Sequence, residues 1–321
     1  MGNYNNHLGL PLTILSMSSV VEALVVEMGM NHFGELSILS HIAMPTISVI
    51  TNIGTAHIGN LGSREGIRDA KLEILDGMIG NELIINGDDD MLLSVLDELS
   101  KKYNVKSVSV DNESTYRAIK MVSDVFSVKF DIEGYVNGIL VNVGGKAYIY
   151  NSLVAYAVGK CLGISDGDIR DGIRDFKLSS SRLEKKITKK GTILIDDTYN
   201  ANYDSMKSSI ELLGKVKDKR KIAILGDMLE LGDYTEKMHK DLGDVVFNNK
   251  IDVLITVGEC SKFIENRVLE LGMNKDNVYH FDKEDDSYSF LDKFLTDNDI
   301  VLLKASHGLH LIGIVDYLMN K

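Results

Sequence analysis

The chain has 321 residues, of which 44% are hydrophobic and 26% are charged, and this length accommodates about two domains with cores of their own. Its net charge of −12 argues against nucleic-acid binding, because affinity for a phosphate backbone comes mainly from clustered Lys and Arg. Cys161 and Cys260 lie far apart in apolar surroundings, which predicts buried, reduced thiols in a cytoplasmic protein. We predict no signal peptide, because residues 1–7 contain neither a basic nor an apolar region. We also predict no membrane partner, because no apolar run approaches the roughly 18 residues of a membrane span.

Short, continuously apolar runs predict strands that are covered on both faces, as in a parallel sheet. These runs are 23–26, 47–50, 83–85, 193–195, 222–225, 253–257 and 300–303. Segments with a helical period lie between them, at 64–78, 204–214, 235–248, 260–271 and 284–295. This alternation predicts an α/β fold. Within residues 105–148, the segments 125–132 and 139–143 alternate in polarity instead and predict antiparallel hairpins.

A polar, serine-rich stretch at 177–182 separates two parts of the chain, and a fresh strand–helix series begins at Thr192. We therefore predict one domain over residues 1–180 and a second, doubly wound domain over residues 181–321.

Polar residues follow five of the predicted strands, at the carboxyl ends where open parallel sheets bind ligands. These strand ends are 27–32, 51–57, 86–90, 226–228 and 304–307. Asn, Asp and Gly are also ordinary turn formers, but five such ends together favour a ligand site. Glu27 is either a Mg²⁺ ligand or a capping carboxylate, and His57 is either a metal ligand or a hydrogen-bonding loop residue.

Lys71 lies on the same helical stripe as Ile67, Ile74 and Met78, so its side chain faces the way the buried residues face. A long lysine can extend out of such a stripe to water. Alternatively it points into a cleft, where burial lowers the pKa of its amine and makes the amine reactive.

The segment 196–206, DDTYNANYDSM, gathers acids, amides and tyrosines directly after an apolar run. It resembles the DDxYNANPxSM motif of the Mur ligases, ATP-dependent enzymes that build peptidoglycan precursors. Other segments resemble motifs of that family in the same order along nearly the whole chain, and together they resemble most the MurF branch, which adds D-Ala-D-Ala. These segments are 2–13 (GNYNNHLGLPLT), 27–29 (EMG), 52–62, 70–74 (AKLEI), 86–89 (NGDD), 182–184 (RLE), 226–232 (GDMLELG) and 304–311 (KASHGLHL).

The resemblance implies three groups of site residues. The Mg²⁺ ligands, which are also the catalytic residues, are Glu27, His57 and Lys71, the last as a carbamate. The residues that bind ATP are Arg182, Asp197, Asn200, Asn86 and Asp88. The residues that face the substrates are Lys304, Ser306 and Asn6.

The chain departs from the family pattern at three points. Tyr203 stands in place of a proline. His307 stands in place of an arginine, and histidine is not an equivalent cation near neutral pH. The phosphate-binding motif G-x-x-x-x-G-K-[ST] does not occur, and the uridine-nucleotide-binding N-terminal domain of the family has no counterpart, so the chain resembles the central and C-terminal parts.

The resemblance therefore implies a ligase in which ATP phosphorylates the terminal carboxylate of UDP-MurNAc-tripeptide. The amine of D-Ala-D-Ala then attacks the acyl phosphate and forms an amide. Two alternatives stay open. One is a non-catalytic Mur-like protein, or part of a split enzyme that a separate N-terminal fragment completes. The other is a different ligase of the same superfamily, such as MurE or folylpolyglutamate synthase.

Overall fold

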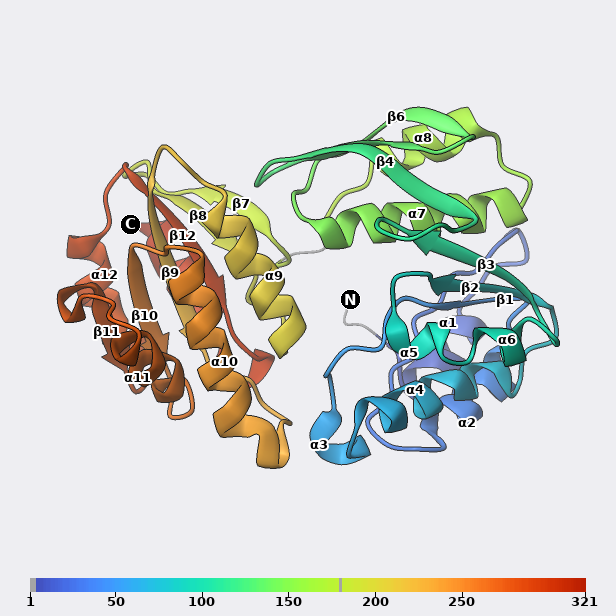
Figure 1. The fold of residues 1–321 in the computed structure, drawn as a ribbon, viewed down its shortest axis with the longest axis horizontal. Coiled ribbons are helices and arrows are strands. Elements are labelled where there is room, and N and C mark those ends of the chain that lie inside the picture. The colour runs from blue at the N-terminus through green and yellow to red at the C-terminus, as the bar shows by residue number, and fades with distance from the viewer. Residues whose placement is uncertain (1–3, 179–180) are drawn as a thin grey trace. The chain divides into compact units, whose positions relative to one another are not determined.

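The computed structural model describes residues 4–178 and 181–321, and its contacts divide the chain into two compact units (Figure 1). The first unit holds the residues up to 120, together with 130–139 and 149–173. The second unit holds 121–129, 140–148 and the residues from 174 onward. Each strand belongs to one of two six-stranded sheets, which confirms the predicted α/β class.

The first sheet has the strand order β1-β2-β3-β4-β5-β6, and its first four strands are parallel. The strands are β1 (Ile47–Ile50), β2 (Glu82–Asn86), β3 (Asn104–Ser109), β4 (Tyr116–Ser123), β5 (Val128–Ile132) and β6 (Val136–Val141). β5 and β6 are neighbours joined by residues 133–135, a connection too short for anything but the predicted antiparallel hairpin. The helical elements are α1 (Gly9–Leu15), α2 (Glu35–Ala43), α3 (Ile58–Leu61), α4 (Arg64–Leu72), η1 (Glu73–Leu75), α5 (Asp90–Leu93), α6 (Leu96–Leu99), α7 (Lys146–Cys161) and α8 (Asp166–Arg174).

The predicted buried strand at 23–26 is wrong. These residues have no regular secondary structure, and Val25 is 86% exposed. Within the described part of the chain, β1 lies at the edge of its sheet and pairs with β2 alone. Continuous apolarity shows what a strand could bury, but it does not provide the neighbouring strand that must satisfy the backbone hydrogen bonds.

The second sheet has the strand order β11-β10-β9-β12-β8-β7, and every pair is parallel except β7–β8. The strands are β7 (Glu184–Ile187), β8 (Ile193–Asp196), β9 (Arg220–Gly226), β10 (Val253–Val257), β11 (Val278–Phe281) and β12 (Asp299–Lys304). The helical elements are α9 (Tyr203–Gly214), η2 (Gly232–Tyr234), α10 (Thr235–Asn248), α11 (Lys262–Glu270), η3 (Lys275–Asn277), η4 (Asp285–Ser287), α12 (Tyr288–Phe294), η5 (His307–Leu309) and α13 (Ile312–Asn320).

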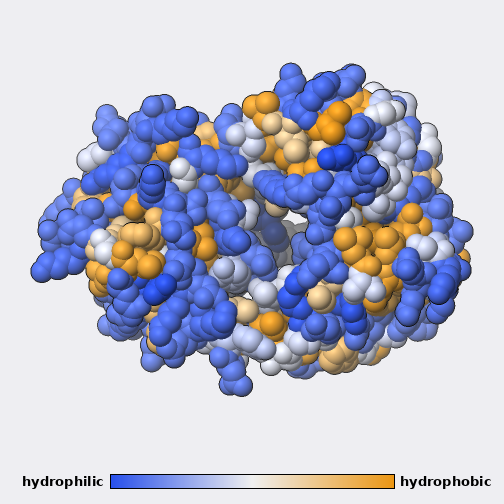
Figure 2. All heavy atoms as spheres, viewed as in Figure 1, coloured by the Kyte–Doolittle hydropathy of each residue, from blue (hydrophilic) through white to orange (hydrophobic). Residues whose placement is uncertain are grey.

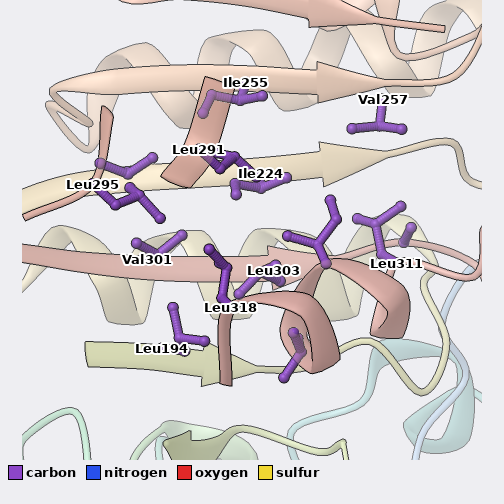
Figure 3. Packing of buried hydrophobic residues seen from close by; sticks show 14 of the residues in the cluster. Leu194, Ile224, Ile255, Val257, Leu291, Leu295, Val301, Leu303, Leu311 and Leu318 are labelled. Carbon is purple, nitrogen blue, oxygen red and sulfur yellow. The ribbon is translucent and has the colours of Figure 1, made fainter. Parts of the chain in front are cut away.

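Helices cover both faces of the second sheet, and this is why its inner strands β8, β9, β10 and β12 are apolar at successive positions. Ile224 packs in one cluster with Leu291 of α12 and Leu318 of α13 (Figure 3). Its neighbour Leu225 is equally buried but points to the other face, where α9 and α11 contact the sheet. The sheet is therefore the doubly wound one that the sequence predicts.

Hydrophilic residues cover most of the face that Figure 2 shows. Exposed apolar side chains are frequent between residues 8 and 25, among them Leu15 at 81% and Val20 at 82%. In residues 4–178 and 181–321, no helix combines the length and the apolar character needed to cross a bilayer.

Candidate functional site

The carboxyl edge of the second sheet has the topology that creates a binding crevice. The chain passes from β8 into α9 and from β9 into α10, and these two helices pack on each other. From β12 it passes instead into α13, which packs with the cluster on the opposite face. Neighbouring strand ends therefore lead to opposite faces, and ligands bind at such a switch point in open α/β sheets.

A buried ion pair joins the ends of β8 and β12. The Lys304 ammonium lies 2.6 Å from the Asp197 carboxylate, and Lys304 is 3% exposed. Lys304 also donates to the Asn200 carbonyl oxygen at 3.0 Å. Asp197 accepts further hydrogen bonds from the Ser209 hydroxyl (2.7 Å) and the Leu183 N–H (3.2 Å). Both charged groups thus fix the loop after β8, and neither projects freely toward a ligand.

Ser306 ties together the loops that follow β8, β9 and β12. Its hydroxyl accepts from the Leu229 N–H at 2.9 Å and donates to the Ala201 carbonyl at 3.2 Å. Its own N–H donates to the Asp227 carbonyl at 3.0 Å. The predicted substrate residues Lys304 and Ser306 are therefore brought to one edge, where they order the surrounding backbone.

Exposed side chains lie over this ordered base. The Arg182 guanidinium stands 4.0 Å from the centroid of the Tyr199 ring, and the His307 ring lies 6.4 Å from that ring. The charges of Asp197 and Arg182 also act on Tyr148 of α7. Burial and the charge of Asp197 raise the pKa of Tyr148 to about 12, and the charge of Arg182 opposes this rise. A permanent cation stacked on an aromatic ring can bind an anion and a planar group side by side.

Asn200, a predicted ATP-binding residue, is exposed beside these side chains. Its side-chain oxygen accepts from the Ala201 N–H at 2.9 Å and from the His307 N–H at 3.4 Å. Arg182, Asp197 and Asn200 are thus brought together by contacts within the second unit, and His307 joins them.

His239 is a site-ordering residue that the motif analysis misses. It is fully buried, its Nε2 accepts from the Met228 N–H at 3.0 Å, and its Nδ1 therefore donates to the Thr235 carbonyl at 2.7 Å. Burial lowers its pKa, which favours the neutral ring that this pattern requires. The signal was present in the sequence, because residue 239 shares a helical stripe with the apolar residues 242 and 246.

In the first unit, Lys71 contacts the loop that follows β1. Its ammonium donates to the Asn52 carbonyl at 2.6 Å, and its side chain is half-buried. The next residue in that loop, Ile53, donates its N–H to Asp89 at 2.6 Å. His57 ends the loop in a left-handed conformation, with φ 61°, just before α3. Lys71, which lies on α4, therefore contacts the loop that leads to His57.

Asp88 and Asn86 hold the backbone after β2. The Asp88 carboxylate accepts from the Tyr150 hydroxyl at 2.6 Å and from the N–H groups of residues 110–112 at 2.6–3.0 Å. Burial opposes the ionisation of Asp88, but these hydrogen bonds outweigh it and lower the pKa. The Asn86 side-chain oxygen accepts from the Asp88 N–H at 2.9 Å. Both side chains are thus engaged with their own chain, and their ATP-binding roles stay predictions.

Glu27 and Asn6 form hydrogen bonds within the N-terminal segment. Exposed Glu27 accepts from the Asn5 side-chain amide at 2.9 Å. The Asn6 side-chain oxygen accepts from the N–H groups of Leu8 (3.1 Å) and Gly9 (2.9 Å), where α1 begins. The predicted substrate role of Asn6 therefore competes with a structural one.

Across the described part of the chain, no three His, Cys, Asp or Glu side chains gather in a way that could hold a metal ion. Mg²⁺ requires oxygen ligands, and a lysine amine supplies none. As they stand, Glu27, His57 and Lys71 do not make a Mg²⁺ site, and their metal roles stay predictions.

Comparison with protein-family models identifies both parts of the chain. Residues 1–159 match the Mur ligase middle domain, and residues 181–307 match the Mur ligase glutamate ligase domain. The UDP-N-acetylmuramoyl-tripeptide–D-alanyl-D-alanine ligase of Bacillus subtilis is 37% identical over 99% of this chain and 69% of its own length. The corresponding ligase of Synechocystis is 30% identical over 99% of this chain and 67% of its length.

Solved structures agree with these matches. A crystal structure of MurF from Acinetobacter baumannii superposes with a TM-score of 0.89 and 29% identity, over all of this chain and 70% of that one. The MurF ligase of Thermotoga maritima, solved in complex with ADP, has the same fold, with a TM-score of 0.84 over all of this chain and 72% of that one, at 24% identity. The chain belongs to the Mur ligase family, and the two curated relatives and two solved structures named above are MurF ligases.

Proposed function

We propose that this chain is an ATP-dependent ligase that joins D-Ala-D-Ala to UDP-MurNAc-tripeptide through an amide bond. The observation that carries the proposal is the 37% identity, over 99% of the chain, to a relative named for this reaction. The alternative of a folylpolyglutamate synthase has less support, because such an enzyme from Mycobacterium tuberculosis matches at 17% identity with a TM-score of 0.70.

In this proposal the exposed side chains at the carboxyl edge of the second sheet bind the nucleotide. Arg182 supplies a permanent positive charge for the phosphates, and Tyr199 supplies a flat surface beside it. The buried Asp197–Lys304 pair and Ser306 keep this edge in one conformation, so that little rearrangement is needed when charge develops during transfer.

The proposal also includes Mg²⁺ and a carbamate on Lys71. A carbamate would replace the ammonium of Lys71 with oxygen donors, which would join the carboxylate of Glu27 and the ring of His57 as ligands. The position of Lys71 supports this, because its side chain reaches the loop that leads to His57. We further propose a cytoplasmic site of action, which the free thiols of Cys161 and Cys260 support. A separate N-terminal fragment as a partner stays a prediction.

The test is D-Ala-D-Ala-dependent release of ADP by the purified chain, supplied with Mg-ATP and UDP-MurNAc-tripeptide, beside an active MurF ligase as positive control. We expect release that requires the dipeptide, and we expect Arg182→Gln to reduce it by about 100-fold or more. Arg170→Gln is the matched control, because Arg170 is an exposed arginine of α8 paired with Asp171. A folded wild-type chain without turnover, or turnover indifferent to the dipeptide, would refute the proposed activity.

A further inference from the structure

The backbone on either side of Arg182 has a conformation that L-residues seldom adopt. Ser181 has φ 61° and Leu183 has φ 50°, both in the left-handed region, and neither is a glycine. Such conformations persist only where the surroundings enforce them, and they are concentrated at functional sites. The structure must therefore contain groups that hold this segment in place.

Three hydrogen bonds hold it to the segment after β8. The Ser181 hydroxyl donates to the Asp196 carboxylate at 3.2 Å, and the Ser181 carbonyl accepts from the Tyr199 N–H at 3.0 Å. The Leu183 N–H donates to Asp197 at 3.2 Å. The Asp196 carboxylate thus binds Ser181, the residue before Arg182, and the Asp197 carboxylate binds Leu183, the residue after it.

Asp196 is itself fixed and is closed to ligands. It is fully buried, and its Oδ2 lies 2.6 Å from the Lys186 ammonium. Its Oδ1 accepts from the Thr198 hydroxyl at 2.7 Å and from the Thr198 N–H at 3.2 Å. Both carboxylate oxygens of Asp196 accept hydrogen bonds from protein donors, so Asp196 is not available to contact a nucleotide directly.

We propose that Asp196, which is held in place by its ion pair with Lys186, is a positioning residue. It holds the strained Ser181–Leu183 backbone and so directs the Arg182 guanidinium toward an anionic group of the ligand. The inference rests on the proposed function, in which that group is the phosphate chain of a nucleotide.

The first test follows the backbone without any ligand, by amide hydrogen exchange in Asp196→Asn. Asparagine keeps the shape but presents an amide to Lys186 and Ser181. We expect exchange at the Leu183 and Tyr199 amides to become about tenfold faster, because both hydrogen bonds depend on the held segment. Unchanged exchange at these two amides would overturn the proposal.

Asp299→Asn is the matched control, because Asp299 is also fully buried and ion-paired in the second sheet, with Arg220 at 2.7 Å. It should speed exchange at the Leu183 and Tyr199 amides no more than elsewhere in the second sheet, whereas Asp196→Asn should affect these two amides more than the rest of that sheet. Ser181→Ala removes only the hydroxyl that bonds to Asp196, and it replaces Asp196→Asn if that variant does not fold.

The second test asks whether Asp196 acts through Arg182, by calorimetric binding of ADP and adenosine. We expect Asp196→Asn to weaken ADP binding about tenfold and to leave adenosine binding unchanged. In an Arg182→Gln background the same substitution should have no further effect on ADP. Additive effects, or an equal loss for adenosine, would show that Asp196 acts otherwise. If Arg182→Gln alone leaves ADP affinity unchanged, the proposed role of Arg182 fails, while the exchange measurement still decides the positioning role.

Discussion

Single residues at the carboxyl edge of the second sheet are mostly engaged with the protein itself. Lys304 is paired with Asp197, Ser306 bonds to two loops, and buried His239 holds the Met228 amide. A buried charge is tolerated when it is paired. When one partner is removed, the other remains as an uncompensated buried charge, which lowers the stability of the fold. Substitution of these residues should therefore affect stability as well as binding.

Lys304→Met tests the buried pair. The substitution leaves the Asp197 carboxylate buried without its cation, and we expect the free energy of unfolding to fall by about 3–5 kcal/mol in urea titrations. The control is Lys237→Met, because the lysine of the Lys237–Asp241 pair is 73% exposed, and a solvent-screened pair should contribute little to stability. Equal losses of unfolding free energy in the two variants would mean that the buried pair stabilises the fold no more than the exposed pair does.

We expect the buried His239 to make the folded protein less stable in mild acid. Burial lowers its folded pKa below the ordinary 6.5, so above that pH the neutral ring contributes fully. As the pH falls below 6.5 toward the folded pKa, the unfolded chain takes up the proton first and stability declines. His239→Gln, which does not titrate, should flatten the urea-unfolding stability profile between about pH 7 and about pH 5, whereas His41→Gln at an exposed position should not. An unchanged profile in His239→Gln would exclude this histidine as the cause.

At the scale of elements, the start of α9 explains a departure from the family motif. Asn202 is the N-cap residue, and its side chain accepts from the Ser205 N–H while the Ser205 hydroxyl accepts from the Asn202 N–H. Tyr203, which stands in place of the family's proline, is the first residue of the helix. Proline is favoured there because that position needs no N–H donor, but other residues are compatible with it. The substitution by Tyr203 therefore leaves the helix start intact.

Asn202→Ala should lower the free energy of unfolding by about 1 kcal/mol, because it removes the side-chain acceptor of this capping box. Asn202→Asp keeps an acceptor at the same place and should retain most of the stability. Thermal unfolding of the two variants side by side gives the comparison. A loss as large in the aspartate variant would point to a role of the amide group beyond capping.

The elements also show what sequence patterns can and cannot predict. Four strands of the second sheet, β8, β9, β10 and β12, were predictable, because helices on both faces require apolar residues at successive positions. The edge strands β7 and β11 were not predicted, because they are only partly buried and lack a continuous apolar run. The run at 23–26 has the same composition but lacks a neighbouring strand in the described chain, which composition does not reveal. For the candidate site, motifs located Lys304 and Asp197 at one edge. They did not show that the two pair with each other, because pairing depends on strand order.

At the scale of the whole molecule, the chain divides into two units; the first holds β1 to β3 and most of β4 to β6, the second holds the whole second sheet, and each has buried apolar residues. Units with separate cores commonly unfold as separate cooperative blocks. The second unit also draws in 121–129 and 140–148, so a cut at the serine-rich stretch would remove part of its contacts: Lys185, for example, stands 4.2 Å from the Phe126 ring. Independence of the units is therefore best tested in the intact chain.

Paired substitutions with hydrogen exchange read by mass spectrometry make that test. Asp299→Asn weakens the ion pair with Arg220 at the start of β9 and β12, where Asp299 also accepts from the Thr296 N–H at 2.7 Å. Lys106→Met breaks the pair with Glu82 that joins β2 and β3. We expect Asp299→Asn to speed exchange in peptides of β9 and β12 by about tenfold or more and to leave β2 and β3 unchanged, with the reverse for Lys106→Met. Faster exchange in both sheets from either substitution would mean that the chain unfolds as one cooperative block, because a local loss of stability spreads only where the units share their unfolding transition.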